Sequence, residues 1–175
     1  MAKAFAALPR APARSILFVA TTGEEEGEIG SDYFVHHAPI AIDKVVASLN
    51  VDGVSIARFT EVVATGGANS SLGATVEEAA RQLGLRVRSE SSELGGSDHS
   101  PFLRAGIPAL WILAELSDEW MRTRHHTPRD DMNQPLDVDA AVRYTELEFL
   151  TGYLVAQNPR RPWWNKGEFF SSARP

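Results

Sequence analysis

The sequence predicts an α/β domain of three layers, in which helices flank a mixed, mostly parallel sheet. Two observations predict this class. Short apolar runs of the kind found in buried strands alternate with segments whose apolar residues recur at helical spacing, and turn residues separate the two kinds of segment. The 175 residues are 43% hydrophobic and 23% charged, which is enough for one domain with an apolar core.

The first predicted elements surround an acidic turn. Residues 1–8 have the pattern of the last two turns of a helix, and the prolines that follow favour an extended connection. Ser15–Ala20 is a nearly continuous apolar run, which predicts a strand covered on both faces. Three consecutive glutamates, Glu24 to Glu26, come next, and Gly27–His37 then predicts a short helix. The apolar face expected for this helix comprises Ile29, Tyr33 and Phe34.

The middle of the chain predicts two strands, a helix and an edge strand. The strands are expected at Asp43–Val51 and Glu61–Thr65. The helix is expected over residues 69–83, because Asn69 or Ser70 can cap its start and a glycine directly after it can cap its end. Its apolar residues recur at helical spacing: Leu72, Val76, Ala79, Ala80 and Leu83. Leu85–Arg88 then predicts a short edge strand.

The last third of the chain contains a long loop and a long helix. The expected elements are a loop over Ser89–Ser97, a short helix over Ser100–Arg104, a buried strand over Ile107–Leu113, a loop over Ser117–Pro135 and a helix over Val138–Gln157. The second loop is rich in His, Pro and Asp, and long ordered loops in compact domains are usually functional. The inward residues expected for the final helix are Val142, Leu147, Leu150 and Leu154. A polar tail, Asn158–Pro175, is expected to wrap the surface.

The composition excludes several classes of function. A formal net charge of −6 and the lack of a basic stripe argue against nucleic-acid binding. No apolar run approaches the roughly 18 residues that a membrane span needs, and residues 1–15 lack the apolar core of a secretion signal, so the compartment is left open. Cysteine is absent, which excludes disulfides and thiolate metal sites. Any metal must therefore bind to His, Asp and Glu, as zinc and manganese do.

Ionisable residues gather where the predicted strands end. Glu24 and Glu25 follow the first strand, Asp52 follows the second, and the histidines of the long loop follow the last. In open α/β sheets, residues at such strand ends converge on one side. Carboxylates and imidazoles suit a catalytic zinc ion, which lowers the pKa of bound water to about 7. A neighbouring carboxylate that does not bind the metal can accept the proton of that water.

Each candidate residue also has a purely structural interpretation. The three glutamates could form a solvated acidic turn. Asp52 could be an ordinary turn residue of an Asp-Gly pair. Asp98 could lie in the first turn of a helix capped by Ser97, a position that is compatible with support of a neighbouring site. His125 and His126 could be exposed loop residues. The sequence pattern alone leaves these alternatives open.

Four motifs follow one another along the chain: TGEEEGEIGSDYF, NVDG, SDHSPFLRAGIPAL and HHTPRDD. In this order they resemble the zinc aminopeptidase family that also includes the glutaminyl cyclases and glutamate carboxypeptidases. That family has a Glu-Glu pair before a glycine- and serine-containing helix start, an Asn-x-Asp at a strand end, a Ser-Asp-His-x-x-Phe with Gly-Ile-Pro, and a Tyr-His-Thr-Pro with Asp. The match covers residues 1–157 and implies a zinc aminopeptidase-like fold.

The resemblance assigns a role to each candidate. Glu24 would be the general base and later the proton donor to the leaving amine. Glu25 and His126 would bind one zinc ion, and Asp52 would bind the other. Asp98 would support the site from outside the metal or face the substrate. The implied activity is that of a metal-dependent exopeptidase, which hydrolyses the N-terminal bond of a peptide with a free N-terminus.

The sequence departs from the family pattern at three nearby positions. Glu26 occupies a variable position and is expected to face solvent. Glu28 replaces a usual leucine, which is expected to weaken the packing of the following helix mildly. His125 replaces a usual aromatic residue, and it remains the alternative to His126 as a zinc ligand.

Two further family motifs have no counterpart in the chain. Upstream of the Glu-Glu strand, the family has a His-x-Asp on a strand, whose His binds one zinc, and an Asp-Asn pair at a helix start, whose Asp bridges both ions. We therefore expect a zinc-peptidase-like domain over residues 1–157, truncated at its N-terminus, followed by the tail over 158–175. With an incomplete ligand set, its activity is expected to be impaired. The alternatives are a glutaminyl cyclase-like acyltransferase and a non-catalytic remnant of a peptidase; the oligomeric state is left open.

Overall fold

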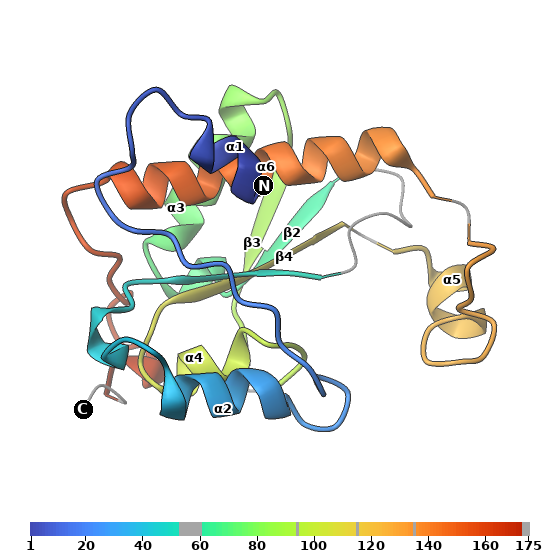
Figure 1. Ribbon diagram of the computed structural model, residues 1–175. Helices are drawn as coiled ribbons and strands as arrows, with labels where there is room; N and C mark the ends of the chain where they lie inside the picture. Colours follow the sequence, from blue (N-terminus) through green and yellow to red (C-terminus); the bar gives the residue numbers. More distant parts are fainter. Residues whose placement is uncertain (53–60, 94, 115, 135, 173–175) are drawn as a thin grey trace.

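The structure, a computed structural model, describes residues 1–52, 61–93, 95–114, 116–134 and 136–172. Within these residues a sheet of four strands forms the centre of the molecule (Figure 1). The strands are β1 (Ser48–Val51), β2 (Val62–Thr65), β3 (Val87–Glu90) and β4 (Ala109–Ala114), in the spatial order β1-β4-β2-β3. The pairs β1–β4 and β2–β3 are parallel, and β2–β4 is antiparallel. The predicted mixed, mostly parallel sheet is confirmed.

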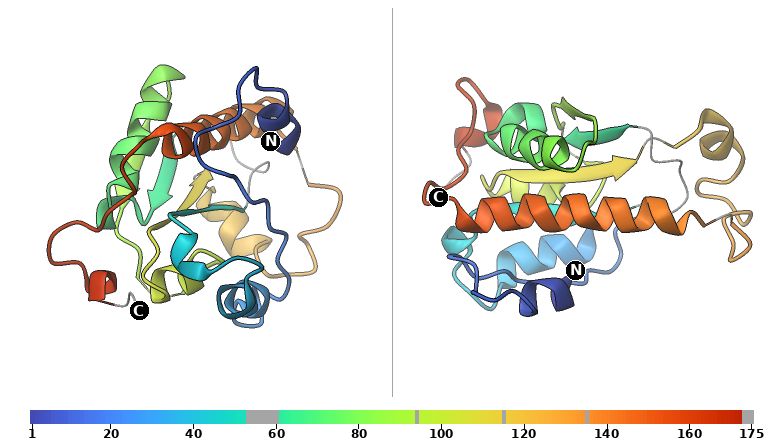
Figure 2. Two further views of the ribbon diagram at one scale, coloured as in Figure 1. Left: turned by 60° about the vertical axis from the view of Figure 1, so that its left-hand side comes forward. Right: turned by 90° about the horizontal axis from the view of Figure 1, so that it is seen from above.

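Helices cover both faces of this sheet, as the three-layer prediction requires (Figures 1 and 2). One layer contains α3 (Leu72–Gln82) and α6 (Val138–Gln157), with the short α1 (Ala2–Ala6) beside α6. The other layer contains α2 (Ile29–His37) and α4 (Ser100–Arg104). The helix α5 (Asp118–Thr123) lies apart from both layers. Among the helices described here, none is long and apolar enough to cross a membrane.

Two apolar clusters fill the spaces between the layers. Between the sheet and the α3–α6 layer, the fully buried side chains are those of Val62, Leu72, Val76, Leu110, Ile112, Tyr144 and Leu147. Between the sheet and the α2–α4 layer, the cluster contains Val35, Phe102, Leu103, Ile107 and Phe170. The sheet therefore has one apolar core on each face, which agrees with the nearly continuous apolar pattern of β2 and β4.

Several predicted elements are confirmed closely. The bounds of α4 and α6 are those expected, and β3 lies at the edge of the sheet. Gly84 follows the end of α3 with a φ of +67°, the left-handed conformation expected of a helix-capping glycine. The tail contacts the body of the protein: the indole N–H of Trp164 donates to the carbonyl of Gly106 at 3.1 Å, and Trp164 packs on Phe170.

The predicted strand at Ser15–Ala20 is wrong. This segment is extended but joins no ladder among the described residues, and it connects α1 to the acidic turn in front of the sheet (Figure 1). The side chains of Leu17, Phe18 and Val19 are 52%, 49% and 44% exposed. A strand forms only where a neighbour satisfies its backbone N–H and C=O groups, and no neighbour does so here.

The inward faces of two helices and the content of the long loop also differ from the prediction. In α2, Ser31 and Val35 are buried whereas Ile29 and Tyr33 are 57% and 63% exposed. In α6, Val142 is 50% exposed. The loop expected over Ser117–Pro135 contains α5, whose start is capped by the side chain of Ser117. Gly53, Pro135 and residues 173–175, which belong to predicted elements, lie outside the described residues.

Candidate functional site

The backbone of the acidic turn is fixed by its own hydrogen bonds. The amides of Gly27 and Glu28 donate to the carbonyl of Glu24 at 3.1 and 2.8 Å, and the amide of Gly30 donates to the carbonyl of Thr22 at 2.8 Å. A side chain at Gly30 would place its Cβ 2.5 Å from the backbone nitrogen of Thr22, so this crossing requires glycine. The turn therefore holds its three glutamates in a defined order.

Glu25 contacts a histidine from the other end of the chain. The Nε2 atom of His126 lies 2.9 Å from a carboxylate oxygen of Glu25, and the two side chains are 59% and 67% exposed. The ring of His125 stacks on that of His126, with 3.7 Å between ring centroids, and lies against Trp120. The structure thus brings His126, and not His125, to the predicted zinc-binding carboxylate.

Asp52 stands at the carboxyl end of β1 and is bound through a serine. The hydroxyl of Ser97 donates to the Asp52 carboxylate at 3.0 Å and accepts from the side-chain amide of Asn50 at 2.8 Å. Ser97 is buried, so it fixes the end of β1 against the start of α4. The pattern Asn-x-Asp is thereby explained locally, because Asn50 orients the serine that orients Asp52.

Asp98 binds both ends of the acidic turn. One carboxylate oxygen accepts from the hydroxyl of Thr21 at 2.6 Å, and the other accepts from the hydroxyl of Ser31 at 2.5 Å. Thr21 precedes the three glutamates and Ser31 follows them. Asp98 therefore lies behind the turn, and its oxygens are occupied by protein donors.

Glu24 lies at the centre of this group of carboxylates. Partial burial raises the pKa of Glu24 above its ordinary value, and the charges of Glu25, Asp52, Asp98 and Glu28 raise it further. These groups therefore surround Glu24 closely enough to disfavour its negative charge. A raised pKa of this kind, with named charged neighbours, is typical of a carboxyl group that exchanges protons, and a bound cation would also relieve the repulsion.

The residues fit zinc in type but not in number. Glu25 and His126 supply one carboxylate and one imidazole in mutual contact, which are ligands that zinc accepts. Among the residues that the structure describes, no three His, Cys, Asp or Glu side chains converge as a metal site would require. Catalytic zinc sites normally have three protein ligands, so the pair provides only part of a coordination sphere.

The sequence interpretation did not include several polar residues that hold the candidate residues in place. They are Thr21, Ser31, Ser97 and Arg104. Ser97 stands directly before Asp98 in a motif that was noted, and this was the available signal. The others come from helices and connections that carry no such motif, and only the fold shows that they meet the acidic turn.

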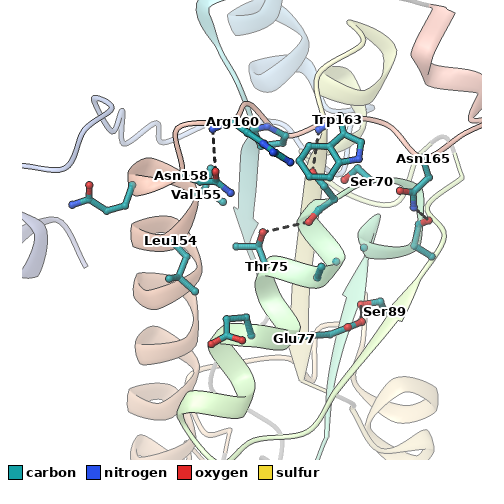
Figure 3. A pocket seen from close by; sticks show the side chains of 18 of the residues that line it. Ser70, Thr75, Glu77, Ser89, Leu154, Val155, Asn158, Arg160, Trp163 and Asn165 are labelled. Atoms are coloured by element: carbon teal, nitrogen blue, oxygen red, sulfur yellow. Dashed lines mark hydrogen bonds between the residues drawn. The ribbon is translucent and has the colours of Figure 1, made fainter.

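A separate groove of about 830 Å³ lies between α3, the end of α6 and the tail (Figure 3). Its lining includes Thr75 and Glu77 of α3, Leu154 of α6, and Arg160 and Trp163 of the tail. None of the predicted site residues lines this groove. It is therefore distinct from the group of residues around Glu24.

Comparison with known proteins gives one family and one fold. A model of peptidase family M28 matches residues 1–150. The structure is similar to LapA aminopeptidase of Legionella pneumophila, with 20% identity and a TM-score of 0.73 over 87% of this chain and 42% of that one. It is also similar to BSAP, a zinc aminopeptidase from Bacillus subtilis, with 22% identity and a TM-score of 0.64 over 81% of this chain and 36% of that one.

A third similar structure is an aminopeptidase from Aneurinibacillus sp. strain AM-1, with 20% identity and a TM-score of 0.65 over 81% of this chain and 33% of that one. The chain thus spans less than half the length of each of these three structures. At identities of this size, the similarity establishes a shared fold.

Proposed function

Because the chain belongs to peptidase family M28, we propose that it serves the metal-dependent hydrolysis of the N-terminal bond of peptides. The observation that carries this proposal is the contact between Glu25 and His126, whose side chains come from segments about 100 residues apart. The aminopeptidases with the same fold support the choice of an exopeptidase.

The roles proposed for the residues follow from their positions. Glu25 and His126 would hold one zinc ion and Asp52 a second, and Asp98 would support the turn. A bound zinc ion supplies Lewis acidity to the substrate carbonyl and acidifies water. Glu24, which is partly buried and has a raised pKa, would accept the proton of the attacking water on a carboxylate oxygen and pass it to the nitrogen of the leaving amine.

The incomplete ligand set leads us to propose weak metal binding and low activity for the 175-residue chain by itself. The described residues bring together only two zinc donors. The same observation favours the second candidate function, a non-catalytic relative of a peptidase that binds metal. A glutaminyl cyclase-like acyltransferase is a third candidate, and a panel of peptide and N-terminal glutamine substrates separates it from a hydrolase.

Calorimetric titration with zinc tests the assignment of Glu25 and His126. We expect the chain to bind zinc weakly, and we expect Glu25→Gln and His126→Ala each to reduce the affinity by more than the ~10–100-fold typical of residues that only orient a ligand. Removal of a donor from a two-donor set leaves a single bond to the metal, which explains the size of the effect.

Glu26→Gln and His125→Ala are the matched controls, since each removes the same group one residue away. Their zinc affinity is expected to equal that of the unchanged chain. Equal losses in the control and test variants, or no zinc binding by the unchanged chain, would contradict the assigned pair. Tight binding of two ions would contradict the proposed weakness of the site.

A further inference from the structure

The segment from Ser97 to Arg104 contacts both halves of the candidate site. Ser97 binds Asp52 at the end of β1, and the next residue, Asp98, binds both ends of the acidic turn. At the other end of α4, Arg104 contacts the side chains of Glu28 and Asp32. Within this network, the ion pair between Arg104 and Glu28 is outside the roles assigned above.

The Glu28 carboxylate is an unusual charge for its position. Its side chain is only 9% exposed, at the start of α2, and its backbone adopts the left-handed conformation with a φ of +60°. A buried carboxylate is costly unless it is paired and hydrogen-bonded. Arg104 supplies that partner, because its guanidinium Nη1 donates to Glu28 at 3.0 Å.

Arg104 is itself held in a fixed orientation. Nη1 also donates to the hydroxyl of Ser100 at 3.2 Å, and Nη2 donates to Asp32 at 3.4 Å. The same Ser100 hydroxyl accepts from the amide of Gly95 at 2.7 Å. A planar guanidinium group with several donors suits such a junction better than the ammonium group of lysine.

A short path connects this ion pair to the proposed catalytic turn. The amide of Glu28 donates to the carbonyl of Glu24 at 2.8 Å, so a displacement of Glu28 displaces the backbone that carries Glu24 and Glu25. Asp98 restrains the same turn through Thr21 and Ser31. The turn is therefore restrained at its two ends by Asp98 and near its middle by Arg104.

From this geometry we infer that Arg104 is a positioning residue: its ion pair with Glu28 fixes the acidic turn, and thereby Glu25, at the distance from His126 and Asp52 that metal binding requires. The inference rests on the proposed function for its last step. Its first step, the restraint of the turn, is independent of any metal.

Hydrogen–deuterium exchange of the full chain tests the first step. Arg104→Met removes the charge and keeps the aliphatic stem, and it is expected to speed exchange at the amides of Glu28 and Gly30 by about 10- to 100-fold, with little change in β2 and β4. Arg81→Met breaks an exposed ion pair with Glu78 in α3 and is the matched control. Its exchange at the turn is expected to equal that of the unchanged chain.

The double variant Glu28→Leu with Arg104→Met distinguishes positioning from general stability. Replacement of both partners by apolar groups is expected to restore slow exchange at the turn. This variant also decides the matter should Arg104→Met alone fail to fold. Fast exchange at the turn in the double variant, an unchanged turn in Arg104→Met, or an equal increase throughout the chain would overturn the inference.

Zinc titration of the same variants tests the second step. Arg104→Met is expected to weaken zinc binding about 10-fold, and the double variant to restore it. A loosened turn with unchanged zinc affinity would contradict the positioning role. Failure of the proposed function gives a different result, since zinc binding would then be insensitive to Glu25→Gln while the exchange effect of Arg104→Met remained.

Discussion

The free energy of unfolding of this chain is expected to fall by about 1.4 kcal/mol for each pH unit above the ordinary histidine pKa of 6.5, and Glu148 is the cause. The side chain of Glu148 is 1% exposed on the inner side of α6. Among the described residues, neither of its carboxylate oxygens has a hydrogen-bond partner, and the hydroxyls of Tyr144 and Thr151 on the same side of the helix also lack one. Burial raises the pKa of Glu148 well above its ordinary value of 4.5.

The sign of the effect follows from the protons that each state binds. The folded chain keeps Glu148 protonated, whereas the unfolded chain releases that proton above pH 4.5. The stabilising contribution is therefore complete below pH 4.5 and is lost as the pH rises toward the raised pKa of the folded state. Burial also raises the pKa of Tyr144, which stays neutral over this range.

His99 has the opposite effect at lower pH. Burial lowers its pKa from 6.5 to about 4, so the folded chain keeps it neutral where the unfolded chain protonates it. Its contribution is present above pH 6.5 and is lost as the pH falls toward 4. Between pH 4.5 and 6.5 the slopes from His99 and Glu148 have opposite signs and similar size, so the stability is expected to be nearly constant there.

Urea unfolding at a series of pH values between 5 and 9 measures both slopes. Glu148→Gln is expected to remove the decline above pH 6.5 and to leave a rising slope below it. Glu146→Gln, an exposed neighbour on the same helix, is the control and should retain the decline. The same slope above pH 6.5 in the unchanged chain and in Glu148→Gln would contradict the assignment.

Hydrolysis of a leucyl chromogenic substrate is expected to be slow for the chain with added zinc and to fall by about 10²–10⁴-fold in Glu24→Gln. Glutamine keeps the size and hydrogen bonding of the side chain but cannot accept the proton of the attacking water. Because Glu24 is not assigned to the metal, zinc affinity should stay the same, and the loss should appear in kcat. Steady-state kinetics together with zinc titration separates these effects.

Glu26→Gln is the control for this experiment, since it removes an exposed carboxylate from the same turn. Its activity is expected to equal that of the unchanged chain. An equal loss in both variants would show that the turn matters only for its total charge. An absence of any hydrolysis by the unchanged chain would favour the non-catalytic candidate.

The fold was predictable where the apolar pattern was supported by local signals. The prediction of α6 succeeded because its pattern continues over five turns and Asp137 caps its start, with its carboxylate accepting from the amide of Ala140. The prediction of Ser15–Ala20 failed because a strand depends on a neighbour that local sequence cannot supply. The inward face of α2 was also wrong, because a helix that is apolar on more than one side leaves the buried side to be decided by packing.

The candidate site was predictable to the extent that chemistry resides in short motifs. Adjacent glutamates after an apolar run and the Asn-x-Asp pattern indicated Glu24, Glu25 and Asp52. The contact between Glu25 and His126 required the fold, because the two residues are distant in sequence. The same holds for Arg104 and Glu28, since nothing in a helix of five residues indicates which carboxylate it will meet.

X-ray diffraction from crystals soaked in zinc, with data collected on both sides of the zinc absorption edge, tests the central claim most directly. The anomalous difference map is expected to show a peak within bonding distance of the Glu25 carboxylate and His126 Nε2, at about 2.0–2.2 Å from each donor atom. The peak should disappear in crystals of Glu25→Gln. A peak bound to other residues, or none between Glu25 and His126 at saturating zinc, would contradict the assigned metal centre.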